Sequence, residues 1–147
     1  MTTSLVIERF LDADRESVYS AWTDPVLMAR WFFVGDGWRT EAENELRVGG
    51  SFRLTMYTAE GERHVMHGEY LEIEPPHRLC FTWSSHVVAG TTVTLELEAR
   101  GKGTHLKLTH HMPDHDDVRR AHELGWQGCL DNLLKGFASS VLGHNRK

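Results

Sequence analysis

The sequence is poor in features that mark several protein classes. No apolar run in its 147 residues approaches the about 18 residues that a membrane-spanning helix needs. Only two cysteines are present, Cys80 and Cys129, and their spacing excludes a paired redox motif and the usual zinc motifs. The first ten residues lack a basic stretch followed by a long apolar one, so no secretory signal is predicted. We therefore expect a cytoplasmic protein with reduced thiols and no membrane span.

Basic residues are also scarce. The chain has 16 Lys and Arg residues against 21 Asp and Glu residues, which gives a formal net charge of −5. Proteins that bind nucleic acid usually carry a basic face, so nucleic acid is not an expected partner. The charge is uneven, with a net of −7 over residues 1–74 and +2 over residues 75–147. Eight of the ten histidines follow position 76, so the second half becomes more positive in mild acid.

The remaining composition is that of an ordinary globular protein. Hydrophobic residues make up 40% and charged residues 25% of the chain. No internal repeat, low-complexity segment or linker divides it. A chain of this length is typical of one domain, so we expect a single domain over residues 1–147.

Most of the chain alternates between apolar and polar residues, which indicates strands with one buried face. Phe52, Leu54 and Met56, for example, alternate with Arg53 and Thr55. Short turns between such segments favour an antiparallel sheet. Strands are predicted over residues 4–11, 38–46 (a weak or edge strand), 51–57, 63–74, 78–84, 91–99 and 104–111.

In the segment over residues 63–74, the apolar residues do not all lie on one face of the predicted strand. Met66, Gly68 and Tyr70 predict one buried face, whereas Leu71 and Ile73 predict the opposite face. An extra residue in one strand would reconcile the two patterns. We therefore expect a β-bulge near Gly68.

Three helices are predicted from capping residues and apolar spacing. Asp14 is a good N-cap for a helix that begins after the first strand, and Asp24 followed by Pro25 starts a second short helix over residues 26–31. Asp114 is expected to cap a long C-terminal helix. The apolar stripe of that helix comprises Val118, His122, Gly125, Trp126, Cys129, Leu130, Leu133, Leu134 and Phe137.

An ordered set of short motifs carries a resemblance to a known superfamily. The matching segments are Val18-Tyr19, Ala21-Trp22-Thr23-Asp24-Pro25, Leu27, Trp31-Phe32, Leu46-Arg47-Val48-Gly49-Gly50-Ser51-Phe52-Arg53, Gly68-Glu69-Tyr70, Ile73-Glu74-Pro75-Pro76, Arg78-Leu79, Phe81-Thr82-Trp83, residues 104–110, Gly125-Trp126, Leu130-Asp131 and Leu133. On these residues the chain resembles the SRPBCC (START-like, Bet v 1-like) superfamily. Within it, the chain is similar to the family of activator of heat-shock protein 90 ATPase homologues (C-terminal domain-like), which includes calicheamicin-resistance-type proteins.

The resemblance implies an α+β helix-grip fold. In this fold a curved antiparallel sheet of about six or seven strands wraps around a long C-terminal helix, and two short helices follow the first strand. It also implies an apolar cavity between sheet and helix. We expect this cavity to bind a small hydrophobic or aromatic ligand without catalysis, with His110 or Tyr70 as polar anchors. The expected lining residues are Trp31, Phe33, Phe52, Leu54, Met56, Met66, Tyr70, Phe81, Trp83, Leu95, Leu108, His110, Trp126, Cys129 and Leu133.

Two other functions stay open at this point. The first is a co-chaperone-like interaction module with a chaperone partner, which predicts a filled core and an exposed apolar or charged patch on the outer sheet or small helices. The second is a cyclase-like enzyme, which needs a buried titratable pair. A pocket of about 300 Å³ or more would favour a ligand or an enzyme, and a closed core would favour the interaction module.

Three smaller features favour structural interpretations. Pro113 separates His110 and His111 from His115 and His122, so these histidines are interpreted as core or solvated residues, and no metal or other cofactor is expected. A thiolate pair of Cys129 with His110 is disfavoured against an inert buried thiol. Glycines in the long helix, Gly125 and Gly128, are interpreted as allowing close packing rather than leaving room for a ligand.

Overall fold

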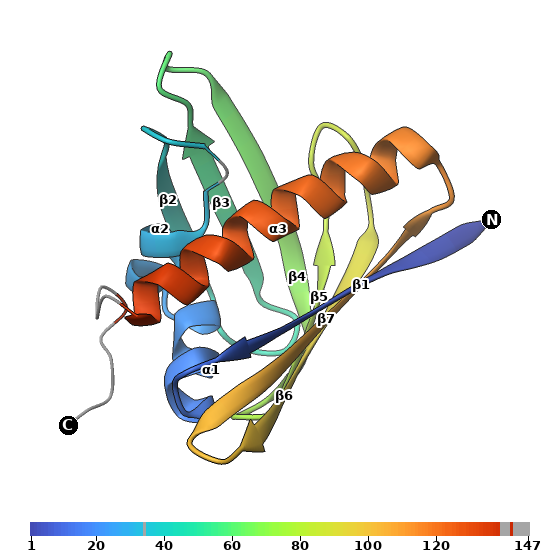
Figure 1. Cartoon of the computed structure of the whole chain (residues 1–147). Helices are drawn as coiled ribbons and strands as arrows, with labels where there is room; N and C mark the ends of the chain where they lie inside the picture. The colour runs from blue at the N-terminus through green and yellow to red at the C-terminus, as the bar shows by residue number, and fades with distance from the viewer. Residues whose placement is uncertain (34, 139–141, 143–147) are drawn as a thin grey trace.

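Seven antiparallel strands form one curved sheet in the computed structural model, which describes residues 1–33, 35–138 and 142 (Figure 1). The order across the sheet is β1-β7-β6-β5-β4-β3-β2. The strands are β1 (Thr2–Leu11), β2 (Arg39–Asn44), β3 (Ser51–Tyr57), β4 (Arg63–Glu74), β5 (Arg78–Trp83), β6 (Thr91–Arg100) and β7 (Gly103–Pro113). This architecture confirms the predicted α+β helix-grip fold.

The sheet buries one face and leaves the other exposed, as alternating strands require. In β3, Phe52, Leu54 and Met56 are buried, whereas Arg53 is exposed. The predicted edge strand is β2, which is short and carries an exposed ion pair of Arg39 with Glu41 at 3.1 Å. Charged side chains on an edge strand discourage pairing with another chain.

The bulge predicted near Gly68 is present in β4, at Leu71. Tyr70 is opposite Phe81 and Glu72 is opposite Cys80, so Leu71 is the extra residue. Gly68 instead permits a close approach of backbones, because a Cβ atom added there would lie 1.9 Å from the carbonyl oxygen of Thr82.

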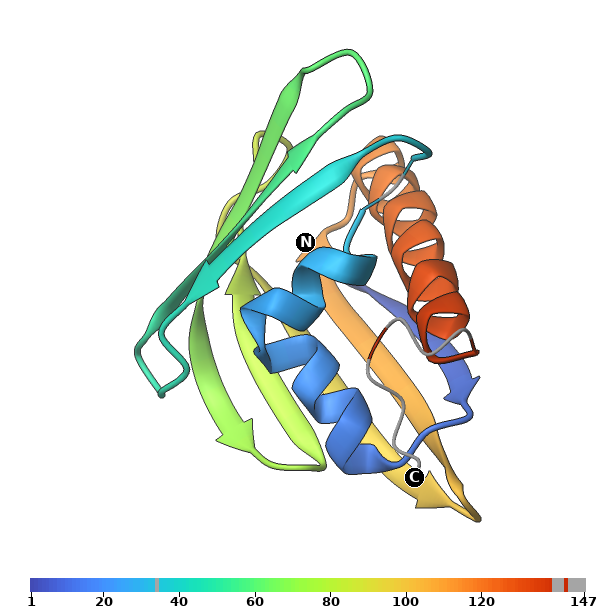
Figure 2. The ribbon, with the colours of Figure 1, turned by 90° about the vertical axis from the view of Figure 1, so that its left-hand side faces the viewer.

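The two short helices lie on the concave side of the sheet and begin at the predicted caps (Figure 2). They are α1 (Arg15–Thr23) and α2 (Pro25–Trp31). The side chain of Asp14 accepts a hydrogen bond from the N–H of Ser17, and that of Asp24 accepts one from Val26, both at 2.9 Å. Each cap satisfies a backbone donor that the first turn of a helix leaves free.

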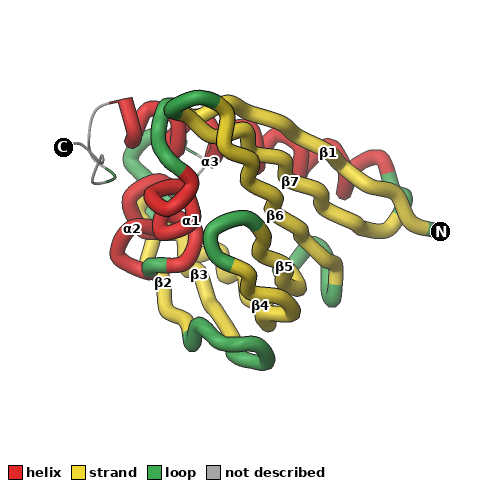
Figure 3. The backbone as a smooth tube through the Cα atoms, turned by 90° about the horizontal axis from the view of Figure 1, so that it is seen from below, coloured by secondary structure: helices red, strands yellow, loops and turns green. Residues whose placement is uncertain are grey.

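The long helix α3 (Asp116–Ala138) crosses the concave face of the sheet, which curves around the helices (Figures 1 and 3). It contacts α2, β1 and β7. The prediction that Asp114 caps α3 is wrong: the helix begins at Asp116, and the residue directly before it is His115. The physical reason is that the N–H of Asp114 still bonds the carbonyl of Met1, which extends the pairing of β7 with β1.

One hydrophobic core lies between the sheet and the helices and runs from Leu5 to Leu142. It includes four of the five tryptophans, namely Trp22, Trp31, Trp83 and Trp126. Among the described residues, no helix is long and apolar enough to cross a membrane.

Candidate functional site

A pocket of about 170 Å³ opens to solvent between α3 and the hairpin of β3 and β4. We call it the open pocket. It is smaller than the about 300 Å³ expected for a drug-sized ligand, but similar to an engineered cavity of about 150 Å³ that binds benzene. Its lining residues are Phe32, Trp38, Met56, His64, Met66, Trp83, Ser85, His86, Val87, Ala121, His122, Gly125, Trp126 and Cys129.

A second, smaller cavity lies deeper in the core, and we call it the inner cavity. Its volume is about 20 Å³, which is room for about one water molecule. Phe32 and Trp83 line both cavities, so their side chains form the partition between them. The inner cavity is lined by Trp22, Met28, Trp31, Phe32, Phe52, Leu54, Tyr70, Phe81 and Trp83.

The fifteen residues predicted to line one cavity fall into three groups. Met56, Met66, Trp83, Trp126 and Cys129 line the open pocket. The inner cavity is lined by Trp31, Phe52, Leu54, Tyr70 and Phe81, and Trp83 lines both cavities. The remaining five are Phe33, Leu95, Leu108, His110 and Leu133, which line neither cavity.

His110 faces inward on β7 but is fully engaged within the protein. The indole N–H of Trp126 donates to His110 Nδ1 at 3.1 Å, so the ring proton lies on Nε2 and is donated to Thr91 Oγ1 at 2.8 Å. The Thr91 hydroxyl in turn donates to the carbonyl of Trp83. Burial lowers the pKa of His110 to about 3, with His122 and His111 adding to the shift. His110 is therefore a neutral structural residue.

The other expected polar groups are engaged as well. The hydroxyl of Tyr70 accepts a hydrogen bond from Asn44 at 3.0 Å, and burial raises its pKa. The thiol of Cys129 donates to the carbonyl of Phe33 at 3.5 Å, and burial raises its pKa to about 12. With both ring nitrogens of His110 occupied, Cys129 and His110 do not form a thiolate pair.

Trp126 is the centre of a rigid aromatic wall. Its ring centroid lies 5.1 Å from that of Trp83, 5.6 Å from Phe32 and 6.0 Å from Trp22. The three contacts are tilted, edge-on and stacked in turn, which are the arrangements that aromatic pairs prefer. The indole N–H groups of Trp22 and Trp83 are buried and make no hydrogen bond within the described part of the chain.

Gly125 leaves room in the open pocket rather than allowing close packing. A Cβ atom added to it would meet nothing within 4 Å, and the residue lines the pocket. The interpretation of Gly125 as a packing glycine is therefore wrong. α3 contacts β1, β7 and α2, and Gly125 lies on the pocket wall beside Trp126 of the same helix.

Nine lining residues of the open pocket escaped the sequence analysis. They come from the segment after α2, from the tip of the β3–β4 hairpin, from the loop between β5 and β6 and from the outer turns of α3. Alternation along a strand cannot place the loop residues among them. A local signal did exist for His64, which lies on the same face of β4 as Met66, and for His122 and Gly125, which belong to the predicted apolar stripe of α3. They are Phe32, Trp38, His64, Ser85, His86, Val87, Ala121, His122 and Gly125.

Three of these missed residues are histidines. His64 stacks on Trp38 with ring centroids 5.8 Å apart, and His86 stacks on His64 at 5.6 Å. On α3, His122 Nδ1 donates to the carbonyl of Val118 at 2.8 Å, because a carbonyl can only accept. Among the described residues, no group of three or more His, Cys, Asp or Glu side chains is arranged to hold a metal ion.

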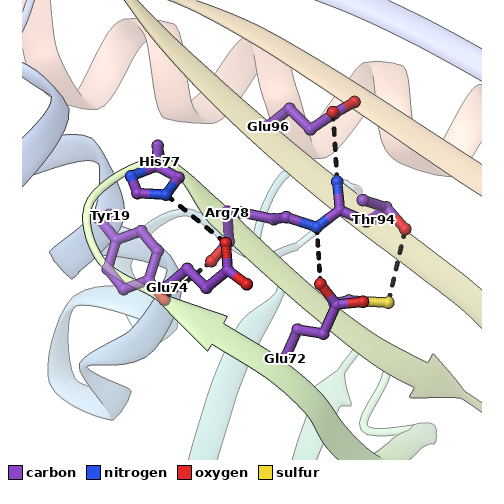
Figure 4. A network of polar contacts seen from close by, with 8 residues as sticks. Tyr19, Glu72, Glu74, His77, Arg78, Thr94 and Glu96 are labelled. Atoms are coloured by element: carbon purple, nitrogen blue, oxygen red, sulfur yellow. Dashed lines mark hydrogen bonds and ion pairs between the residues drawn. The ribbon is translucent and has the colours of Figure 1, made fainter.

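A charged groove of about 510 Å³ lies elsewhere, on residues of β1 and β5–β7 with Arg15 of α1. Arg78 is held between Glu72 at 2.7 Å and Glu96 at 3.3 Å (Figure 4). The hydrogen bond to Glu72 is the main cause that raises the pKa of Arg78. The hydroxyl of Tyr19 donates to the carbonyl of Arg78 at 3.1 Å, and burial raises the Tyr19 pKa to about 12.

The comparisons with known proteins agree with this architecture. The family model of Activator of Hsp90 ATPase homolog 1-like protein matches residues 12–138. The AHSA1-like protein from Aeromonas hydrophila is 27% identical, with 99% of each chain covered and a TM-score of 0.84. CalU16 from Micromonospora echinospora is 32% identical, with 90% of this chain and 74% of that chain covered and a TM-score of 0.70. Protein CV1439 from Chromobacterium violaceum is 28% identical, with 90% and 94% covered and a TM-score of 0.80. No curated protein matches the sequence.

Proposed function

Since the chain belongs to the family of Activator of Hsp90 ATPase homolog 1-like proteins, which shares the helix-grip fold, we propose that its open pocket binds a small hydrophobic or aromatic molecule. The observation that carries the proposal is the space beside Gly125. A glycine inside a helix costs about 1 kcal/mol relative to alanine, and here it leaves an apolar pocket unfilled. Apolar pockets with few polar groups are the usual sites for small molecules.

The size and walls of the open pocket define the ligand. A volume of about 170 Å³ suits one or two fused rings. Trp83, Trp126 and Phe32 offer aromatic surfaces, and Met56 and Met66 offer flexible apolar ones that adapt to shape. A flat aromatic molecule is therefore favoured over a long acyl chain.

Binding is favoured over acid–base catalysis by the state of the buried titratable groups. An acid or base in a pocket needs a free proton-accepting or proton-donating atom within reach of the ligand. His110 and Cys129 each bond another protein group, and burial keeps both neutral near pH 7. His110 and Cys129 therefore supply no acid or base, and we propose a carrier or sensor of the ligand, with His64, His86 and His122 as its polar contacts rather than as catalysts.

The test is calorimetric titration of the protein with naphthalene derivatives, with the site mapped by NMR shifts of the tryptophan indole N–H signals. Gly125→Leu fills the open pocket from α3, so we expect at least about tenfold weaker binding. Asp131→Leu, on an exposed position of the same helix, is the matched control and should bind like the wild type. Equal binding by the Gly125→Leu variant would place the ligand elsewhere and contradict the proposal.

The charged groove favours a second candidate function, binding to a chaperone of the Hsp90 type. The family description names activation of that ATPase, and the groove provides a charged patch with Arg78 at its centre. The test is titration of the protein onto a purified Hsp90-type chaperone with its ATPase rate as readout. The function would be supported if Arg78→Ala abolished the change in ATPase rate and Arg53→Ala, at an exposed position of β3, did not. If the wild-type protein does not bind the chaperone, this second function is excluded.

A further inference from the structure

We infer that the ligand of the open pocket carries an acidic group, a carboxylate, that is bound by the histidines of the pocket lining, His64, His86 and His122. The inference rests on the proposed function, because it names the chemical class of the molecule that this pocket takes. It comes from the kinds of polar side chain that line the pocket, and from the atoms that those side chains leave free.

The polar groups of the open pocket are almost all histidine. His64 comes from β4, His86 from the loop between β5 and β6, and His122 from α3. The other lining residues are apolar or aromatic, apart from Gly125, the hydroxyl of Ser85 and the neutral thiol of Cys129. No Asp, Glu, Lys or Arg lines the pocket among the described residues. Any charge that the pocket acquires is therefore positive and belongs to these three rings.

The three rings also have ring atoms to offer a ligand. His122 uses Nδ1 for the carbonyl of Val118, and its Nε2 makes no hydrogen bond within the described part of the chain. The ring of His64 stacks on Trp38 and on His86, so these contacts use ring faces and leave the nitrogens at the ring edges. In the same wall, the buried indole N–H of Trp83 lacks an acceptor among the described residues. The three histidine rings and the Trp83 indole can therefore donate hydrogen bonds to an anionic oxygen of the ligand.

Protonation determines how strongly these donors bind an anion. A protonated imidazole donates from both nitrogens, and its hydrogen bonds to a carboxylate are charge-assisted and about twice as strong as neutral ones. Histidine is the side chain type best suited to take up a proton in mild acid, where a simple carboxyl group is still ionised. The remaining titratable groups beside the pocket, His110 and Cys129, stay neutral in mild acid. The affinity for an acid should therefore rise as the pH falls.

The net charge of −5 makes the histidines necessary for this role. With its histidines neutral the protein repels an acid at long range, so the aromatic walls alone would favour the neutral form of a ligand. A preference for the acid over its neutral counterpart can then come only from groups at the site. This difference separates the inference from the proposed function, which requires only that the aromatic part binds.

The experiment compares 2-naphthoate with the uncharged 2-naphthamide by calorimetry at pH 5.5 and pH 8. We expect the acid to bind about tenfold more tightly than the amide at pH 5.5 and about equally at pH 8. In the triple variant His64→Gln, His86→Gln and His122→Gln, the amide should bind as before and the preference for the acid should disappear. His67→Gln is the matched control, because His67 lies on β4 three residues from His64 and on the exposed face.

The outcomes distinguish the two proposals. Equal binding of acid and amide at both pH values would overturn the inference and leave the proposed function intact. A preference for the acid that survives in the triple variant would also overturn it. Failure of both compounds to bind the wild type would overturn the proposed function itself. If the triple variant does not fold, His86→Gln alone serves, since His86 is exposed and its loss should weaken the preference without disturbing the core.

Discussion

The neutral ring of His110 makes the stability of the protein depend on pH. Its pKa is about 3 in the folded protein and 6.5 in an ordinary environment. Below pH 6.5 the unfolded chain therefore binds a proton that the folded protein does not, so stability that is fully present above pH 6.5 is lost progressively toward pH 3. We expect this residue alone to lower the free energy of unfolding by about 2 kcal/mol between pH 7.5 and pH 5.

Urea denaturation at both pH values measures this effect. The variant His110→Gln should be less stable at pH 7.5, because it disturbs the bonds to Trp126 and Thr91, yet its stability should change less with pH. His115→Gln, at an exposed position, should keep the pH dependence of the wild type. An unchanged pH slope in His110→Gln would show that His110 is not the responsible group.

The same substitution at two glycines should have opposite effects. Gly125→Ala adds a methyl group where nothing lies within 4 Å and improves helix propensity, so we expect a gain in stability of up to about 1 kcal/mol. Gly68→Ala places its methyl group against the backbone carbonyl of Thr82, and we expect a loss of about 1–3 kcal/mol. Thermal unfolding compares the two variants directly. Stabilisation by Gly68→Ala would contradict the close approach of β4 and β5.

At this scale, sequence reasoning could place side chains but not assign their partners. His110, which was expected on a cavity wall, does face inward on β7 together with the buried Leu106 and Leu108. Its two partners come from β6 and α3, 19 and 16 residues away in the sequence. Only the assembled fold shows that Trp126 and Thr91 occupy both nitrogens, which removes His110 as a ligand anchor.

Among the elements, α2 depends on the single carboxylate at its start. Asp24 caps this seven-residue helix, which carries Met28 and Trp31 into the core beside the inner cavity. Asp24→Ala should lower the free energy of unfolding by about 1 kcal/mol, and Asp24→Asn should retain most of it, because Asn also accepts the backbone hydrogen bond. Chemical denaturation of both variants tests this. Equal losses in the two would indicate that the charge, and not the cap, stabilises α2.

The limits of most elements could be predicted because their signals are local. Alternation fixed β3 and β4 at the residues observed, and the caps Asp14 and Asp24 correctly marked the starts of α1 and α2. The exact position of the bulge and the start of α3 depend instead on contacts between strands. The bulge lies at Leu71 because the pairing with β5 decides it, and α3 starts late because Asp114 pairs with the first residue of the chain.

At the scale of the whole molecule, the sequence indicated a cavity between sheet and helix. It could not show that this space is divided into the open pocket and the inner cavity. Of the fifteen residues expected to line one cavity, ten lie along one or the other of two cavities. The pattern could not show that Phe32 and Trp83 separate the space into two, because Phe32 follows the end of α2 and its direction depends on how α2 meets α3. There the carbonyl of Phe32 accepts a hydrogen bond from Thr40, and that of Phe33 accepts one from Asn132.

This partition sets the size of ligand that the protein can take. Phe32→Ala removes the ring between the two cavities and should join them into one larger pocket. We expect a loss of stability of about 3–5 kcal/mol, as for other buried Phe→Ala substitutions. We also expect a shift of preference from one- and two-ring toward three-ring aromatic molecules, measured by calorimetry with a series of ring sizes.

Phe137→Ala is the control for this shift, because Phe137 is equally buried but lines neither cavity. It should lose similar stability and keep the ligand preference of the wild type. If Phe32→Ala is too unstable to purify, Phe32→Leu opens the partition less and should show a smaller shift in the same direction. A ligand preference that does not change in either Phe32 variant would mean that the inner cavity is not available to ligands, and that Trp83 alone closes it.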